Sequence, residues 1–458
     1  MAKYKAYPEY KDSGIEWLGD IPTHWICTQI KYGYDITLGK MLQKNKSSSK
    51  DELKPYLKAQ NIQPTGIDLS VVDNMWFSPD EKNKLLLKKN DVLISEGGDV
   101  GRSAIWQGQL VECYIQNAIN RARAMNGNSP YFLNYWMVYL KSSDFINTLC
   151  NKATIAHYTA EKVESSPLLL PNSDEQLHIS LFLDHETAKI DKLIEKQQQL
   201  IELLKEKRQA VISHAVTKGL NPDVPMKDSG VEWLGDVPAH WDICLLKFKC
   251  SAITDGAHIS PDTNEGEHYF VSIKDIKKGI IDFNNSLLTS SASYKYLVKT
   301  GCKPFSGDIL FSKDGTIGQT AIVPDDVDFV VASSLIIIRA DKEKTLPAFM
   351  DLLLQSSLVK EQVESFVKGA ALRRLSIQNL EKVFGIFPTL SEQQIISDYI
   401  YAQLNRLDVL ESKAVVQIQL LEERRTALIS AAVTGKIDVR DWVAPDTQDV
   451  EEPQEATA

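Results

Sequence analysis

The chain has 458 residues, of which 43% are hydrophobic and 24% charged, the ordinary balance of a globular protein with two or three domains. No apolar run approaches the roughly 20 residues of a membrane helix, and the N-terminus MAKYKAYPEY lacks the apolar core of a signal peptide. Six cysteines without a CxxC pair argue against a disulfide framework or a zinc site and favour a cytoplasmic protein. The net charge of −10 does not exclude nucleic acid as a partner, because residues 26–170 carry 17 bases against 14 acids.

Two copies of one stretch frame the chain. Residues 11–25 read KDSGIEWLGDIPTHW and residues 227–241 read KDSGVEWLGDVPAHW, with twelve of fifteen positions identical. The Asp, Glu and His side chains could suggest an active site, but each copy stands directly before a large block. We therefore interpret the stretch as a repeated structural leader and the chain as a tandem duplication. The residues expected to be packing anchors are Trp17, Trp233, Pro22, Pro238, Trp25 and Trp241.

Behind each leader lies a block, 26–170 or 242–387, and the two blocks stay in register at an offset of 217. The segment NDVLISEGGDVGRSAIW (90–106) aligns without a gap with GDILFSKDGTIGQTAIV (307–323), and both predict a strand, a glycine turn and a second strand. The apolar run 329–338 predicts a single buried strand. Each block is therefore expected to be a mixed α/β (α+β) domain.

A long helix is predicted after each block, over 171–218 and 388–436. PNSDEQ and PTLSEQ begin these helices with a capping residue and an acid three positions on, and Gly219 and Gly435 are expected to end them. Apolar residues recur every seven positions in a stripe so narrow that it favours a coiled coil, and the simplest arrangement pairs the two helices. The residues predicted to form this seam, or to dock partners, are Ile190, Ile194, Ile201, Leu204, Val211, Leu404, Leu407, Ile418, Leu421 and Leu428.

Four polar residues interrupt the seam. They are Gln197, Arg208, Glu411 and Arg425. Such residues could set the register of the helix pair or face a partner, and they could equally be surface-reaching side chains at the edge of the seam. The sequence leaves both interpretations open.

This layout resembles the DNA-specificity subunit of type I restriction–modification systems. The resemblance covers nearly the whole chain and rests on the duplicated leaders, the two variable blocks, the EQ-initiated helices and the closing motifs KEKRQAVISHAVTKG and EERRTALISAAVTGK. It implies that each block is a target recognition domain reading one half of a bipartite DNA site. It also implies that the two long helices pair as an antiparallel coiled coil that separates the domains, in a pseudo-two-fold internal repeat.

The same resemblance implies which partners the chain has. Modification (methyltransferase) subunits, expected to be two, would dock on it together with motor-nuclease restriction subunits. S-adenosylmethionine, and ATP with Mg for restriction, are expected on those partners, so that this chain would be non-catalytic and hold no cofactor or metal of its own.

Two other classes of function have to be weighed against this one, a stand-alone enzyme (an adenine methyltransferase or a nuclease) and a protein scaffold. A stand-alone adenine methyltransferase would need an Asn/Asp-Pro-Pro-aromatic motif, of which only a partial form occurs at 221–224. A nuclease could use Asp262, Asp275 and Lys277 to hold Mg²⁺, but the first half has no equivalent pattern. A coiled-coil scaffold that binds only proteins would not need two large, diverged blocks.

Base reading requires Arg, Lys, Asn or Gln at groove edges, and phosphate contacts require basic or small polar groups. Such residues recur at corresponding places in the two blocks, namely after ITLG and ITDG, in the glycine turns, and shortly before the long helices. For any single one, a solvated surface charge is the competing interpretation. The DNA-binding candidates are Lys40, Lys44, Lys46, Arg102, Arg121, Arg123 and His157 in the first block, and His258, Lys313, Arg373 and Arg374 in the second.

The expected organisation follows from these motifs. Residues 441–458 carry six acids and no base, and this composition predicts a disordered tail. In chain order we expect a leader (1–25), a recognition domain (26–170), a long helix (171–218), a linker with the second leader (219–241), a second recognition domain (242–387), a second long helix (388–436) and the acidic tail (437–458).

Overall fold

The computed structural model describes residues 4–150, 156–231, 234–263, 266–277, 279–367 and 373–444. The chain forms two compact units, of which the first combines two segments that are distant in sequence and the second is one continuous segment. Unit 1 consists of Met1–Gln197 and Val416–Ala458, and unit 2 consists of Gln198–Val415. None of the helices within the described ranges is long and apolar enough to cross a membrane.

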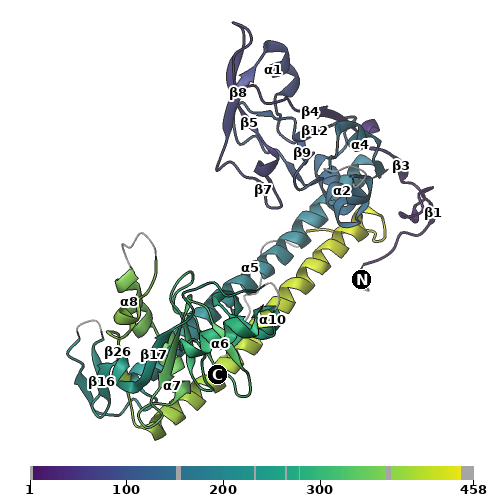
Figure 1. Cartoon of the computed structure of the whole chain (residues 1–458). Coiled ribbons are helices and arrows are strands. Elements are labelled where there is room, and N and C mark those ends of the chain that lie inside the picture. Colours follow the sequence, from purple (N-terminus) through teal and green to yellow (C-terminus); the bar gives the residue numbers. More distant parts are fainter. Residues whose placement is uncertain are drawn as a thin grey trace. The chain divides into compact units, whose positions relative to one another are not determined.

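Each unit is built on a four-stranded antiparallel sheet, and Figure 1 labels β4, β9 and β12 of the sheet in unit 1 and β17 of the sheet in unit 2. The strand order is β10-β9-β12-β4 in unit 1 and β23-β22-β25-β17 in unit 2. Alternating apolar residues of these strands enter the cores on both faces, which is why the central strands are buried along their length. The strands are β4 (Tyr34–Leu38), β9 (Val92–Ser95), β10 (Ser103–Ile105) and β12 (Ile119–Ala124), and β17 (Cys250–Asp255), β22 (Ile309–Ser312), β23 (Thr320–Ile322) and β25 (Leu335–Ala340).

A three-stranded sheet accompanies the larger one in each unit. Its order is β11-β5-β8 in unit 1 and β21-β18-β24 in unit 2, and the β11/β5 and β18/β24 pairs are parallel. The two units therefore share one topology strand by strand. The strands of these sheets are β5 (Glu52–Leu57), β8 (Asp73–Phe77) and β11 (Tyr114–Ile115), and β18 (His268–Val271), β21 (Leu287–Thr289) and β24 (Phe329–Val331).

The remaining elements also occur in corresponding pairs. Two-stranded sheets form between β1 (Tyr10–Asp12) and β2 (Asp20–Pro22), β3 (Ile26–Gln29) and β13 (Pro167–Leu170), β6 (Ile62–Gln63) and β7 (Gly66–Ile67), β14 (Met226–Asp228) and β15 (Asp236–Pro238), β16 (Asp242–Leu245) and β26 (Phe384–Phe387), and β19 (Ile276–Lys277) and β20 (Ile280–Ile281). The shorter helices are α1 (Pro79–Leu85), α2 (Pro130–Ser142), α3 (Phe145–Cys150) and α4 (Ala160–Ser165), and α6 (Ser291–Lys299), α7 (Pro347–Gln355), α8 (Ser357–Val367) and α9 (Ile377–Leu380).

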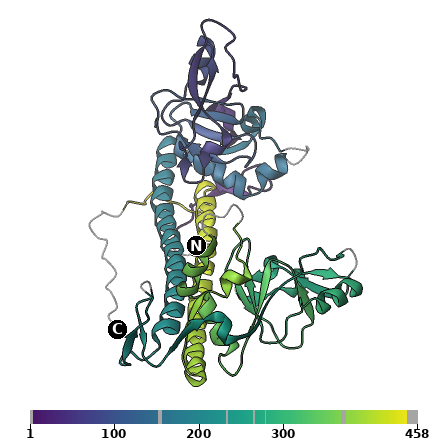
Figure 2. The ribbon, with the colours of Figure 1, turned by 60° about the vertical axis from the view of Figure 1, so that its left-hand side comes forward.

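The two long helices are α5 (Ser173–Lys218) and α10 (Leu390–Val433), and they run side by side within each unit (Figure 2). The side chain of Asn172 caps α5 by accepting a hydrogen bond from the amide of Glu175 at 2.9 Å, as predicted. All ten predicted seam residues are buried or half-buried, whereas most positions between them are exposed. The seven-residue pattern thus identified the contact face of both helices.

Cross-helix ion pairs show that the helices are antiparallel. In unit 1, Arg425 of α10 donates to Asp191 of α5, with 2.8 Å between Nε and Oδ1. In unit 2, Arg208 of α5 pairs with Asp408 of α10. The start of one helix therefore packs against the end of the other in both units. The arginines that interrupt the seam are engaged with the partner helix.

The leaders pack against the first turns of the long helices. Trp25 is fully buried and its Nε1 donates to the carboxylate of Glu175 at 3.0 Å, while His24 Nε2 lies 2.9 Å from the same carboxylate. Trp241 and His240 contact Glu392 in the same way, at 3.1 and 2.9 Å. These contacts favour the interpretation of the leader as a structural element. The acid in the helix-start signature therefore anchors the leader through its side chain.

The other expected anchors differ from one another. Pro22 and Pro238 are buried. Trp17 stacks on Phe145 with a centroid distance of 5.0 Å but remains 42% exposed, so it covers the surface of the unit without entering its core. The corresponding Trp233 lies outside the described residues.

Two expectations from the sequence are wrong. The apolar run 329–338 contains two strands in different sheets, β24 and β25, because Ser333 and Ser334 interrupt it where the chain passes from one sheet to the other. The tail predicted to be disordered from residue 437 is ordered over its first residues, since Ile437 and Val439 are buried in the core of unit 1. The predicted disorder of 445–458 falls outside the described residues.

Candidate functional site

A polar loop cluster forms in each unit at the edge of the four-stranded sheet where β4 or β17 ends. Gly39 and Gly256 follow these strands. A Cβ atom at Gly39 would lie 2.2 Å from the carbonyl oxygen of Gln116, and one at Gly256 would lie 2.0 Å from that of Ala332. Only glycine, which has no Cβ atom, allows the backbone to pass this close to the neighbouring segment. The same close approach occurs in both units.

The crossing brings the next residue beside a second segment. Lys40 donates its amide to the carbonyl of Ile115 at 3.0 Å and accepts from the amide of Asn117 at 2.8 Å. In unit 2, Ala257 pairs in the same parallel manner with Ala332. Backbone hydrogen bonds thus fix the start of the loop after Gly39 and Gly256 against the segment that precedes β12 or β25.

The glycine turn between β9 and β10, or between β22 and β23, is attached to this segment. Glu96 donates its amide to Ala118, and Lys313 donates its amide to Ser334, at 2.9 and 3.0 Å. A fourth segment joins through the amides of Tyr158 and Leu375, which donate to the carbonyls of Glu96 and Lys313. The loop cluster consists of residues 39–43, 96–102, 116–118 and 157–158 in unit 1, and of residues 256–260, 313–319, 332–334 and 373–375 in unit 2.

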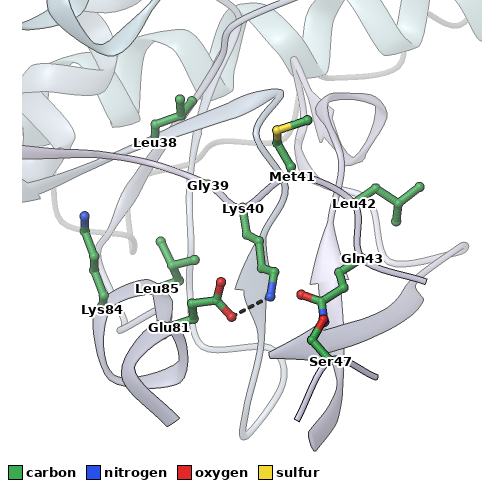
Figure 3. Close-up of a pocket in the computed structure, with 10 residues that line it drawn as sticks. All are labelled: Leu38, Gly39, Lys40, Met41, Leu42, Gln43, Ser47, Glu81, Lys84 and Leu85. Carbon is green, nitrogen blue, oxygen red and sulfur yellow. Dashed lines mark hydrogen bonds and ion pairs between the residues drawn. The ribbon is translucent and has the colours of Figure 1, made fainter. Parts of the chain in front are cut away.

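In unit 1 the cluster combines apolar and titratable side chains. Met41 is 75% exposed and lines an open groove of about 580 Å³, at whose side Lys40 forms an ion pair with Glu81 (Figure 3). His157 Nδ1 lies 3.9 Å from a carboxylate oxygen of Glu96. Burial raises the pKa of the Glu96 carboxyl, and the charge of His157 opposes this effect only in part.

In unit 2 the cluster is a charged network. The carboxylate of Asp255 pairs with Lys313, and its second oxygen lies 2.9 Å from Nε2 of His258. The guanidinium of Arg374 donates to the carbonyl of Ser333 at 3.0 Å and lies 3.8 Å from Asp314. Lys313 is only 4% exposed in its side chain, so His258 and Arg374 are the groups that this network presents to solvent.

The two units thus hold different side chains on one backbone arrangement. At the offset of 217, Glu96 corresponds to Lys313 and His157 corresponds to Arg374. The hydrogen bonds that fix these positions are made by backbone amides and carbonyls, so the side chains can vary without altering the loops. Such a site can present different donors, acceptors and apolar groups to two different ligands.

Several predicted residues belong to this cluster or continue from it. Lys40, Arg102 and His157 of unit 1, and His258, Lys313, Arg373 and Arg374 of unit 2, lie within its segments, and Lys44 and Lys46 follow directly on. Arg102 is turned back onto the domain, where it donates to the carbonyl of Ala59 and pairs with Asp99, each at 3.3 Å. Arg373 makes two 2.7 Å hydrogen bonds to Glu364 and remains exposed.

Arg121 and Arg123 lie elsewhere, on strand β12. Arg121 is 3% exposed, and its guanidinium donates to the side chains of Asp35 and Thr37. Arg123 makes a bidentate pair with Asp91 at 2.7 Å for both bonds, and Arg339 pairs with Asp308 in unit 2. Their role in DNA binding stays a prediction, but these contacts favour a role in holding the sheet together.

Sequence reasoning missed several polar residues of the cluster. Gln116 and Asn117 of unit 1 are half-buried, and within the described residues their side-chain amides have no hydrogen-bond partner. In unit 2 the position of Gln116 is taken by Ala332, and Ser333 and Ser334 occupy the positions of Asn117 and Ala118. A signal was present, because two serines in an otherwise apolar run, ten residues long, mark a break between strands.

The nuclease pattern does not form a site. The carboxylate of Asp275 accepts hydrogen bonds from the amide and hydroxyl of Ser272 at 2.7 and 2.9 Å, while Lys277 pairs with Asp282. In the part of the chain that the structure describes, no group of three or more His, Cys, Asp or Glu residues is arranged to hold a metal ion.

Comparison with known proteins agrees with the duplication. Residues 35–203 and 248–418 each match the family model of the type I restriction modification DNA specificity domain. The chain is 20% identical over 454 residues to the specificity subunit of the type I restriction enzyme EcoBI from Escherichia coli, covering 95% of this chain and 91% of the relative. It is 22% identical to the EcoKI specificity subunit of Escherichia coli K12, covering 93% and 92%.

Solved structures show the same fold. A chain from a study of complex assembly and conformational transition of the type I R-M system superimposes with a TM-score of 0.67 at 12% identity, covering 90% of this chain and 98% of the other. The HsdS subunit from Thermoanaerobacter tengcongensis superimposes with a TM-score of 0.51 at 14% identity, covering 91% and 98%.

Proposed function

The chain belongs to the type I restriction–modification DNA specificity family, and from this premise we propose that it reads a bipartite DNA site with one loop cluster per half-site. The observation that carries this proposal is that both units fix four loop segments by the same backbone contacts while lining them with different side chains. A DNA site with two different halves requires two binding sites with different side chains, and the two loop clusters provide them on the same backbone arrangement.

The side chains of the clusters suit contacts with base edges. An arginine such as Arg374 can donate to the O6 and N7 acceptors of guanine, and free amides such as those of Gln116 and Asn117 can pair with adenine. Exposed apolar groups such as Met41 can contact the methyl group of thymine. Lysines beside the cluster supply contacts to phosphates, which position the protein without selecting sequence.

We also propose that the chain catalyses no reaction. In this proposal the modification subunits supply the S-adenosylmethionine chemistry, and the restriction subunits supply ATP- and Mg-dependent cleavage. The contacts of Asp275 and Lys277 support it, because a carboxylate that caps its own turn is not available as a metal ligand. The six cysteines are free thiols, which suits the reducing cytoplasm as the place of action.

Partner docking is assigned to the outer faces of the long helices. Leucines that do not belong to the seam remain between 46% and 60% exposed there: Leu193 and Leu203 on α5, and Leu410 and Leu420 on α10. These leucines correspond in pairs at the offset of 217, so both halves of the chain present the same apolar positions. This repetition supports two modification subunits binding in equivalent ways.

Arg374 provides the direct test of base reading. Methylome sequencing of cells that carry the chain with its modification subunit first identifies the bipartite motif. We expect Arg374→Ala, alone or with Arg373→Ala, to weaken binding to a duplex containing only the second half-site by about 10-fold, because one base contact contributes about 1–3 kcal/mol. His157→Ala is the matched control, which should weaken binding only at the first half-site. Equal binding of the arginine variants and the parent would contradict the assignment.

A further inference from the structure

A basic loop of unit 1 continues from the loop cluster and has no counterpart in unit 2. It spans residues 44–50, KNKSSSK, and its Ser47 lines the same groove as Met41 and Gln43 (Figure 3). Its seven residues are all exposed. Within the described residues, no carboxylate pairs with Lys44, Lys46 or Lys50. The neighbouring lysines of the same domain that do form ion pairs are Lys40, Lys54, Lys58 and Lys82.

The loop is held in one conformation by a buried carboxylate. Asp51 is 5% exposed and accepts hydrogen bonds from the backbone amides of Ser47 and Ser48 at 2.9 and 3.0 Å. The hydrogen bond from the amide of Ser47 is the main cause that lowers the pKa of the Asp51 carboxyl. The carboxylate of Asp51 is thereby bonded to the backbone of the loop, and within the described residues it forms no ion pair with the three lysines.

A second contact fixes the position of Lys46. The amide of Trp76 donates to the carbonyl of Gln43 at 3.1 Å, which holds the base of the loop against strand β8. The ammonium of Lys46 lies 5.2 Å from the centroid of the Trp76 ring, a cation–π distance. A lysine held in this way loses less side-chain entropy when it meets an anion.

The chemistry of this loop fits the phosphodiester backbone. Three unpaired ammonium groups and three exposed serine hydroxyls form a continuous set of donors without an outward-facing acid. In unit 2 the corresponding stretch, AHISPDTNEGEH at 257–268, contains no lysine or arginine and three acids. The sequences of the two units therefore carry opposite charge in this stretch.

We propose that residues 44–50 form a phosphate-binding loop that contacts the DNA backbone beside the first half-site, and that unit 2 binds its half-site without such a loop. This inference rests on the proposed function and adds an asymmetry to it. The first half-site should bind with the steeper dependence on salt, because each phosphate that a lysine neutralises releases condensed counterions from the duplex.

The test measures binding of the full chain, with its modification subunits, to two short duplexes, each of which ends in the spacer and contains only one half-site of the methylated motif, so that the phosphates beside the other half-site are absent. Salt is varied from about 50 to about 200 mM. For Lys44→Ala, Lys46→Ala and Lys50→Ala combined, the slope of log K against log salt should fall by about 0.9 for each lysine lost on the first half-site. It should not change on the second half-site, and arginine at the three positions should restore the slope.

A matched control removes the same charge elsewhere in unit 1. Lys31, Lys88 and Lys89 are exposed and precede β4 and β9, so they lie at the end of the sheet opposite the loop cluster. Their combined replacement by alanine should leave both slopes unchanged. An unchanged slope in the loop variant, or an equal fall in the control or at the second half-site, would overturn the phosphate-binding loop. A parent chain that does not prefer the motif to a fully scrambled duplex would instead refute the proposed function.

Discussion

A buried carboxyl group distinguishes unit 2 from unit 1 at one position of the core. Asp351 of α7 is 6% exposed, and its Oδ2 accepts a hydrogen bond from Gln355 at 2.8 Å. Burial raises its pKa to about 6, since a charged carboxylate is poorly solvated there. At the corresponding position of unit 1, Asn134 is uncharged and accepts a hydrogen bond from Ser103 at 2.9 Å. The same position is therefore occupied by a titratable side chain in unit 2 and by a neutral one in unit 1, so only in unit 2 does it make stability depend on pH.

We expect Asp351→Asn to change how the stability of unit 2 depends on pH. The folded pKa lies above the unfolded one, so the folded state binds the proton more tightly, and stability falls as pH rises from about 4 through about 6. The loss above that range is about 3 kcal/mol for a shift from the ordinary value of 3.8. Denaturant unfolding at about pH 4 and about pH 8 should show that the variant lacks this loss.

Asp341→Asn serves as the control, because Lys344 lowers the pKa of Asp341 and its removal shifts stability in the opposite direction. If parent and Asp351→Asn lost the same free energy of unfolding across this pH range, the carboxyl would not be the source of the effect.

At the residue level, the sequence indicated which residues of the two units correspond, but it did not indicate which side chains form ion pairs. The offset of 217 matched Arg374 to His157, and the residues that follow them, Leu375 and Tyr158, make the same backbone hydrogen bond in the two units. It could not reveal that Arg121 and Arg123 are neutralised by Asp35 and Asp91, because Asp35 lies on β4 and Asp91 directly precedes β9, both distant in sequence from β12. Which strands become neighbours depends on sheet topology, and the order of the chain does not specify it.

At the scale of elements, the long helices were the most predictable part. A repeat of seven over more than forty residues leaves one face for contact, and that face is the one buried within each unit. The role of its polar interruptions could not be decided from the sequence. In the structure, Arg208 and Arg425 each form an ion pair with an aspartate of the other long helix. The two arginines, and the two aspartates, are related by the offset of 217.

A double-mutant cycle measures how much such a pair contributes. Arg208 and Asp408 are 35% and 51% exposed in their side chains, so solvent screens their attraction. We expect Arg208→Ala and Asp408→Ala to be coupled by about 0.2–1 kcal/mol in denaturant unfolding, and the coupling should shrink as salt increases. A cycle without coupling at low salt, or with coupling above about 2 kcal/mol, would contradict this description of the pair.

At the scale of the whole molecule, the duplication explains why unit 1 combines both ends of the chain, whereas unit 2 is one continuous segment. In unit 1 the hydroxyl of Tyr10 donates to the carbonyl of Gly435 at 3.0 Å, and in unit 2 Gly219, at the end of α5, packs on Trp241. The second leader follows α5 directly in sequence, whereas the first meets the end of α10 only in the fold. The sequence showed both leaders and both helices but could not place Gly435, because nothing local records a contact across 425 positions.

The same duplication makes the central claim open to one direct measurement. In a chimera, residues 26–170 are replaced by a second copy of residues 243–387, the same stretch at the offset of 217, so that both leaders and both long helices are kept. Methylome sequencing of cells carrying this chimera with its modification subunit should yield a motif containing two copies of the half-site read by unit 2, with the other half-site lost. A motif identical to that of the parent chain would contradict the claim that each unit reads its own half of the DNA site.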